Sequence, residues 1–425
     1  MKRRSFLRHT AGALAGSITL PSLLGATPSR NQAAKAPSKN SAKKLLLIFQ
    51  RGGNDALNTL VPVGDAAEYA AYRAARPNLG LAKSDLLSLQ ASDFFGFHPS
   101  LAPMADLING GRVSFVSGVG YPDMNTSHFV SQAVWETGEP GNRHGSGWLN
   151  RYLQASSRDA VPRALMIDSN QSQTMSGAYT VPVSENFGAL DLPLPADAGP
   201  DAGRLQALMR NLNRLDAEAA QAGWTDSTDR LFSMFDRFRN RDLSQYQPAN
   251  GAKYPNSRFG RNLQHAVQLL KDQPTPLNLN SVMVNHVGYD HHRDQIGADV
   301  LSGSHAHLLG ELALGIQAAS ADLGSELDDV LILVVSEFSR TVRENGSRGT
   351  DHGGGAVAML VGGSATGRLV NSGAHWPGLT DHKLPWVTDF RDLYAEVLER
   401  HLGASQSEIG AALPNYTANR LGILG

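Results

Sequence analysis

The chain has 425 residues and a formal net charge of -1, and charged residues make up 18% of it. This balance argues against a polyanionic partner such as DNA or RNA, which needs clustered basic charge. The absence of cysteine excludes disulfides, thiolate metal sites and cysteine nucleophiles. Any metal must therefore be held by His, Asp, Glu or hydroxyl ligands, and these suit Zn, Mn, Mg or Ca.

Residues 1–40 predict an export signal and linker. A basic head with Arg3 and Arg4 precedes a mildly apolar stretch, residues 11–24, and the pattern resembles a twin-arginine signal. The stretch is too short and too rich in Gly, Ser and Thr to span a membrane. We expect passage through the twin-arginine export machinery, cleavage after Ala26 or Ala36, and a periplasmic or otherwise exported protein without a transmembrane anchor.

Short apolar runs along the rest of the chain predict strands that are buried on both faces, as in a parallel sheet. They cover residues 45–49, 113–120, 164–169, 281–287, 329–335 and 356–363.

Segments with helical spacing of apolar residues lie between these runs. They cover residues 65–76, 98–112, 130–135, 203–222, 226–241, 258–272, 300–323 and 388–403. The alternation predicts an α/β fold, a three-layer sandwich around a mostly parallel sheet. Residues 41–425 are expected to form one domain, with a helical insertion at about 200–275.

Polar residues follow several of the predicted strands, at the sheet edge where open α/β folds bind ligands. In chain order they are Asp55, Thr126-Ser127-His128, Asp290-His291-His292, Glu337 with Arg340, and Asp351-His352. Carboxylates and imidazoles at one edge can hold divalent metals, and two metals about 4 Å apart can clamp a tetrahedral anion. A hydroxyl on such a metal loses its proton more easily and becomes a nucleophile.

Each of these residues also has a purely structural reading. Asp351 and His352 lie in a glycine-rich stretch that is typical of a turn, and Asp55 follows Gly-Gly in the same way. Ser127 or Thr126 could be the N-cap of the next helix. Their joint occurrence after successive strands favours a site.

Several motifs together resemble the exported bacterial family catalogued as domain of unknown function 1501. They are "LLLIFQRGGNDALNTLVP", "GVGYPDMNTSHF", "GSGWLNRYL", "GYDHHRDQ", "LILVVSEFSRTVRENGSRGTDHGG" and "TDFRDLYAEVLERHLG". That family is similar to the alkaline phosphatase and sulfatase superfamily, which implies an alkaline-phosphatase-like fold, a two-metal site and a Ser or Thr nucleophile.

The resemblance implies a role for each matching residue. Ser127 would be the nucleophile, with Thr126 as the alternative, and Arg340 would bind the anionic substrate. Asp55, Asp351 and His352 would hold one metal, and Asp290 and His292 the second.

The sequence departs from the superfamily pattern around the second metal. The pair Asp290 and His292 is more closely spaced than usual, which makes His286 and Asp294 competing ligands. His375 and His382 are the candidates for a third ligand.

We therefore expect an exported, metal-dependent hydrolase of phosphate or sulfate esters, acting on an anionic ester or envelope glycan. The alternative is a non-catalytic metal-binding or scaffold protein of the cell envelope with the same fold.

Overall fold

A computed structural model describes residues 43–157, 162–185, 204, 207–208, 232–233, 245–271, 277–380 and 382–425. The predicted export signal lies outside the described residues, as do almost all of the predicted helices 203–222 and 226–241. The single-domain boundaries and the helical insertion therefore stay predictions.

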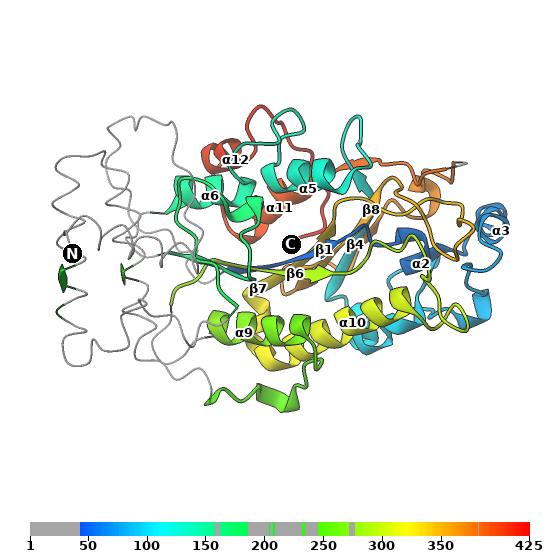
Figure 1. Cartoon of the computed structure of the whole chain (residues 1–425), viewed down its shortest axis with the longest axis horizontal. Helices are drawn as coiled ribbons and strands as arrows, with labels where there is room; N and C mark the ends of the chain where they lie inside the picture. The colour runs from blue at the N-terminus through cyan, green and yellow to red at the C-terminus, as the bar shows by residue number, and fades with distance from the viewer. Residues whose placement is uncertain are drawn as a thin grey trace, which may run out of the picture.

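Within the described residues an eight-stranded sheet forms the centre of the molecule (Figure 1). The strand order is β10-β4-β8-β7-β1-β6-β5, with β9 paired to β4. The strands are β1 (Lys44–Arg51), β4 (Val113–Gly120), β5 (Ala164–Ile167), β6 (Ser281–Val287), β7 (Val330–Ser336), β8 (Ala356–Gly362), β9 (Leu369–Val370) and β10 (Thr388–Asp389). A separate antiparallel pair is formed by β2 (Leu60–Pro62) and β3 (Phe95–Phe97).

The sheet is mostly parallel, as the buried apolar runs predict. Strand β1 is parallel to β6 and β7, whereas β8 is antiparallel to both of its neighbours, β4 and β7. Because β8 is antiparallel to β7, the connection 337–355 begins and ends at the carboxyl edge of β7. A bridge between Arg340 and His352 closes this connection on itself.

Alternate residues of β1 face opposite layers, as expected for a strand with helices on both faces. Leu46 and Ile48 belong to one apolar cluster, and Leu45, Leu47 and Phe49 to another. Each such fully buried side chain contributes roughly 1.5–3 kcal/mol to folding. These two cores confirm the predicted three-layer α/β arrangement.

Helices cover both faces of the sheet (Figure 1). On one face lie α9 (Arg258–Lys271) and α10 (Ser304–Leu323), and on the other α5 (His128–Thr137), α6 (Trp148–Ser156), α11 (Phe390–Glu396) and α12 (Gln406–Ala412). The four-residue helix α2 (Ala56–Thr59) follows β1, and α3 (Ala66–Ala75) begins at its N-cap Asp65, whose carboxylate accepts from two backbone N–H groups.

Two predicted helices differ in the structure. Residues 98–112 form a 3₁₀ segment, Pro99–Met104, followed by the short α4 (Ala105–Asn109). Pro103 lies inside the 3₁₀ segment and lacks the N–H that an α-helical hydrogen bond needs. The last long helix ends as a π-helical segment, Val397–His401.

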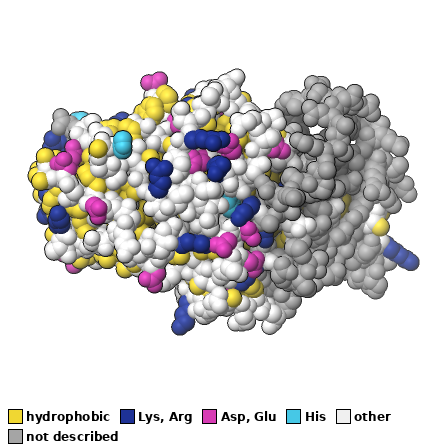
Figure 2. Space-filling view, turned by 180° about the vertical axis from the view of Figure 1, so that it is seen from behind, with side chains coloured by type: hydrophobic (Ala, Val, Ile, Leu, Met, Phe, Trp, Pro, Cys, Tyr) yellow, Lys and Arg dark blue, Asp and Glu magenta, His cyan; other side chains and the backbone are white. Residues whose placement is uncertain are grey.

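In the part of the chain that the structure describes, no helix combines the length and apolarity needed to cross a bilayer. On the face drawn in Figure 2, basic and acidic side chains are interspersed and do not form a patch of one sign.

Candidate metal centre

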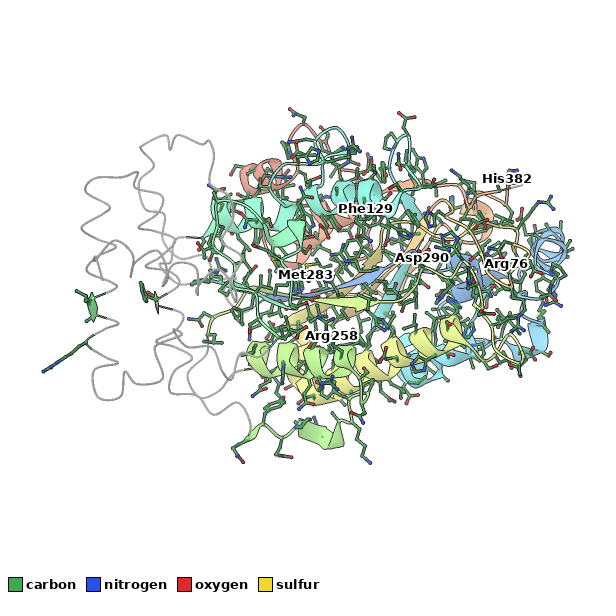
Figure 3. All side chains as sticks on the ribbon, viewed as in Figure 1. Arg76, Phe129, Arg258, Met283, Asp290 and His382 are labelled. Carbon is green, nitrogen blue, oxygen red and sulfur yellow. The ribbon has the colours of Figure 1, made fainter. Side chains whose placement is uncertain are left out.

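Three side chains from three separate connections meet beyond the carboxyl edge of the sheet. His128 begins α5, Asp290 follows β6, and His352 precedes β8. One ligand atom from each lies within 4.8 Å of the others, and this is the group of potential metal ligands found among the described residues. We call these three residues the metal-ligand cluster. Figure 3 shows Asp290 beyond the strand ends, with Arg76 farther out.

The Oδ1 atom of Asp290 is the centre of this cluster. His128 Nε2 lies 3.2 Å from it and His352 Nε2 3.3 Å. His292 adds a further imidazole, with its Nε2 atom 3.1 Å from the same oxygen and 2.8 Å from His352 Nε2. Three imidazole nitrogens therefore approach one carboxylate oxygen.

The hydrogen-bond partners assign the proton on each of these imidazoles to the remote nitrogen. His128 Nδ1 donates to Glu337 at 2.8 Å, and His352 Nδ1 donates to the Thr126 carbonyl at 2.5 Å. His292 Nδ1 donates to Asp351 at 2.9 Å. The Nε2 lone pairs of all three rings then point at an anionic oxygen.

Arg340 Nη1 also contacts Asp290 Oδ1, at 2.9 Å, and the remaining repulsion among acceptors is relieved either by a proton on an Nε2 atom or by a divalent cation. His128 Nε2 is buried, and the polar atom that it faces is Asp290 Oδ1, 3.2 Å away. Metal-binding histidines usually donate their other N–H to a carboxylate or a carbonyl, as these three do. The donor set, three nitrogens and one oxygen, therefore fits a divalent cation and suits a tetrahedral Zn²⁺ site in particular.

Glu337 holds His128, one residue of the cluster, in position. It is fully buried at the end of β7, and its Oε1 atom accepts from Gly52 N, His128 Nδ1 and Gln132 Nε2 at 2.8–2.9 Å. Burial acts to raise its pKa, but these hydrogen bonds outweigh burial and lower it. Glu337 is thus an anion that orients His128 and ties α5 to the glycine turn after β1.

The charges around the cluster are strongly coupled. Burial opposes ionisation of Asp290, but Arg340 and His128 outweigh it and lower its pKa to about 2. Burial acts to lower the pKa of His128, but the hydrogen bond and charge of Glu337 raise it overall. Burial and the nearby charge of His128 lower the pKa of His352. Asp290 is therefore held as a carboxylate by Arg340 and His128.

Arg340 does not fit the substrate-binding role predicted for it. Its side chain is fully buried, and its donors are occupied by Asp290, the Gly52 carbonyl and both oxygens of Thr350. A guanidinium in this position binds Asp290 and is not accessible to an incoming anion. Arg340 is therefore a positioning residue in this geometry.

Asp55 lies apart from the cluster, in a different buried network. Its oxygens accept from Arg76 at 2.7 and 3.0 Å and from Gln295 at 2.6 Å. Burial opposes its ionisation, yet Arg76 and the hydrogen bonds lower its pKa to about 2. Its predicted role as a metal ligand is not supported by this arrangement, because Arg76 and Gln295 occupy both of its oxygens and it belongs to no group of potential ligands among the described residues.

The remaining predicted ligands divide between the cluster and its surroundings. Asp351 contacts the cluster through His292. His286 is committed elsewhere, to Glu311 and Tyr289. Asp294 belongs to no group of potential ligands in the described ranges, and the same holds for His375 and His382.

Ser127 is the N-cap residue of α5, and the residues on either side of it in the chain both contact the cluster. Its neighbours are Thr126, whose carbonyl binds His352, and His128 itself. The Ser127 hydroxyl makes no capping hydrogen bond. The structure thus gives no support to the reading of Ser127 as a helix-capping side chain, and its predicted role as nucleophile stays open.

Sequence reasoning placed His128 and Glu337 at strand ends but assigned neither a role. The signal for both was in the chain: His128 directly follows the two hydroxyl residues, and Glu337 is the first residue after β7. Neither position alone reveals that the two side chains meet.

Comparison with known proteins places the chain in a family. The model of "Protein of unknown function (DUF1501)" matches residues 42–409, so the chain belongs to this family. No functionally curated protein matches it. Among solved structures, the phosphonate monoester hydrolase of Agrobacterium radiobacter is similar over 85% of this chain and 74% of that chain, at 10% identity and a TM-score of 0.30. At this TM-score the similarity does not establish a shared fold. The expectation of an alkaline-phosphatase-like fold therefore rests on the sequence motifs.

Proposed function

For this member of the DUF1501 family, we propose a metal-dependent hydrolase of phosphate or sulfate esters. The observation that carries the proposal is the convergence of three imidazole Nε2 atoms on Asp290 Oδ1, each ring having its other nitrogen bonded to an oxygen acceptor. His128, His292, His352 and Asp290 would hold the ion, with Zn, Mn, Mg or Ca as the candidates. When bound, a divalent metal supplies a Lewis acid that lowers the pKa of a nearby hydroxyl and offsets charge on an ester oxygen.

Ser127 is the nucleophile in this proposal, with Thr126 as the alternative. Its hydroxyl oxygen forms a bond to the phosphorus or sulfur, the bond to the alcohol oxygen breaks, and the hydroxyl proton ends on the departing alcohol. Water then attacks the enzyme-bound ester, its hydroxyl leaves with the released anion and its other proton returns to Ser127. Glu337 keeps the Nδ1 proton on His128, and Arg340 keeps Asp290 ionised and in place.

The location proposed for this reaction is outside the cytoplasm. The paired Arg3 and Arg4 before an apolar stretch support export through the twin-arginine machinery into the periplasm. An anionic ester or envelope glycan is the substrate class that this location favours.

The test is a screen of aryl phosphates, phosphodiesters and sulfates with the purified full chain in the presence of Zn, Mn, Mg or Ca. We expect turnover that is lost in Ser127→Ala and kept in Ser407→Ala, an exposed serine on α12. Equal turnover by both variants would show that Ser127 is not the nucleophile.

The second candidate is a non-catalytic metal-binding protein of the cell envelope. The observation that favours it is the occupation of Arg340, which leaves the cluster without its predicted anion clamp. Stoichiometric metal in a protein that turns over none of the screened esters would select this candidate.

A further inference from the structure

His292 lies beside the metal-ligand cluster but is not one of the three residues whose ligand atoms all lie within 4.8 Å of one another. Its Nε2 atom is 3.1 Å from Asp290 Oδ1 and 2.8 Å from His352 Nε2. Its side chain is 45% exposed, whereas those of His128 and His352 are 21% and 24% exposed. Of the three imidazoles, His292 is therefore the one whose position is least fixed by burial.

The position of His292 depends on the connection between β7 and β8. Its Nδ1 atom donates to Asp351 Oδ1 at 2.9 Å. Its backbone carbonyl accepts from Asn345 Nδ2 at 2.9 Å, and the same Nδ2 atom approaches Asp351 Oδ1 at 3.4 Å. Gly349 lets the two chain segments approach closely, since a Cβ atom there would lie 2.5 Å from the His292 carbonyl carbon. The Asn345 amide thus binds both His292 and the carboxylate that orients its ring.

The two ends of the Asn345 amide make separate contacts. The Oδ1 atom accepts from the backbone N–H groups of Ser347 and Gly349 at 2.9 and 3.2 Å, which shapes the turn that Asn345 begins. The Nδ2 atom instead reaches out of this turn to the segment that carries His292. A substitution that keeps the acceptor and removes the donor therefore separates a structural role in the turn from a role at the metal site.

We propose that Asn345 is a positioning residue that holds His292 where it can act as the fourth ligand beside the metal-ligand cluster. Groups that orient a metal ligand typically contribute 10–100-fold to metal affinity. Without the Asn345 donor, the three residues of the cluster remain as ligands and the fourth position is open to water. The inference rests on the proposed function, and it concerns a side chain that would not touch the ion.

The test is a double-mutant cycle on the full chain, with zinc affinity measured by calorimetric titration of metal-free protein. We expect Asn345→Asp to weaken zinc binding by roughly 10–100-fold. The added negative charge by itself favours a cation, so a weaker affinity cannot arise from charge alone. In a His292→Ala background the same substitution should have no further effect, because the ligand on which Asn345 acts is already absent.

Asn250→Asp is the matched control. Asn250 also precedes a glycine, and its Nδ2 atom donates to a backbone carbonyl, that of Ala321, at 2.8 Å. Its zinc affinity should equal that of the wild type. Asn345→Ser is a second variant at the site, because a serine hydroxyl can accept in the turn but supplies no amide donor to His292 and adds no charge. The thermal unfolding midpoint of each variant establishes that it is folded.

Cobalt in place of zinc gives an independent readout of the ligands. The visible absorption of Co²⁺ changes with the number and the geometry of its ligands. The spectrum of cobalt-loaded Asn345→Asp should match that of His292→Ala and differ from that of the wild type. A side chain that only shaped its own turn would leave this spectrum unchanged.

Each outcome bears on the inference. Wild-type zinc affinity or a wild-type cobalt spectrum in folded Asn345→Asp overturns it, as does a loss that simply adds to that of His292→Ala. If Asn345→Asp does not fold, Asn345→Ser decides in its place, and failure of both to fold also overturns the inference. The expected cycle without turnover of any ester contradicts the hydrolase and leaves the role of Asn345 standing. A wild type that binds no zinc overturns both.

Discussion

Glu337 accepts a hydrogen bond from His128 Nδ1 at 2.8 Å, and this contact determines which ring nitrogen of His128 faces Asp290. Because the carboxylate is fully buried and also binds Gly52 and Gln132, it is held in place from several directions. The orientation of the first ligand of the cluster therefore depends on a residue that would not touch the ion.

Replacement of Glu337 should weaken metal binding without removing a ligand. Glu337→Gln keeps the shape but loses the charge that supports the imidazole, and carboxylates of this kind contribute on the order of 10–100-fold to metal affinity. Calorimetric titration of metal-free protein with zinc measures the effect. Glu399→Gln, whose partners are Gln406 and Arg420, is the control. An unchanged zinc affinity in Glu337→Gln would contradict the orienting role.

Replacement of Arg340 distinguishes a positioning residue from a substrate-binding one. Arg340→Gln leaves the carbonyls of Gly52 and Thr350 without donors and Asp290 without its cation, so we expect a lower unfolding midpoint and weaker metal binding. The loss of stability should be on the order of 2–4 kcal/mol. Chemical denaturation and metal titration of the same preparation provide both values. A raised KM with unchanged stability and metal affinity would restore the predicted substrate-binding role.

Replacement of Asp55 should lower stability and leave metal binding unchanged. Asp55→Asn leaves a buried Arg76 without its counter-charge, which costs roughly 3–5 kcal/mol for a buried pair. The metal content should stay at the wild-type value, because Asp55 is outside the metal-ligand cluster. Denaturant unfolding and elemental analysis measure the two effects. If Asp55→Asn loses metal and keeps its stability, Asp55 is a ligand after all.

A pH dependence of stability should arise from histidines next to Asp55. Burial lowers the pKa of His98 and of His291 to about 4, and it lowers the pKa of His305 well below its usual value. The unfolded chain therefore binds more protons than the folded one between these values and about 6.5. Stability is fully present above that upper limit and falls as the pH drops, by up to roughly 1.4 kcal/mol per unit and per histidine.

His305→Leu should flatten this dependence. Both ring nitrogens of His305 are buried and lack hydrogen-bond partners, so an apolar side chain loses no bond there. Urea unfolding at about pH 7 and about pH 5 measures the slope for this variant, the wild type and the exposed control His382→Gln. Equal slopes in all three proteins would exclude His305 as a source of the dependence.

Much of the fold could be predicted because its signals are local. The run Leu45–Phe49 is apolar at every position, which is typical of a strand covered on both faces, and β1 is the result. Pro103 could have indicated the interruption of the helix predicted over 98–112, since proline removes a hydrogen bond wherever it falls inside a helix. The direction of β8 has no local signal, because a strand reads the same whichever way its neighbours run.

The sequence could indicate which residues are candidates for the site, but not which side chains each of them contacts. Asp290, His292 and His352 were expected from their places after strands, and all three meet in space. Asp55 was expected on the same grounds, but its partner Arg76 is the C-cap residue of α3, and nothing in the sequence indicates that the end of this helix brings a guanidinium to Asp55. Burial and pairing across the chain decide which carboxylate remains available for an ion.

The most direct test of the central claim is a crystal of the full chain grown with zinc and measured at the zinc absorption edge. The account predicts one anomalous peak with His128 Nε2, Asp290 Oδ1 and His352 Nε2 about 2.0–2.2 Å away, His292 Nε2 as the fourth ligand, and loss of the peak in Asp290→Asn. Absence of a peak at these atoms, or a peak at Asp55 instead, would contradict it.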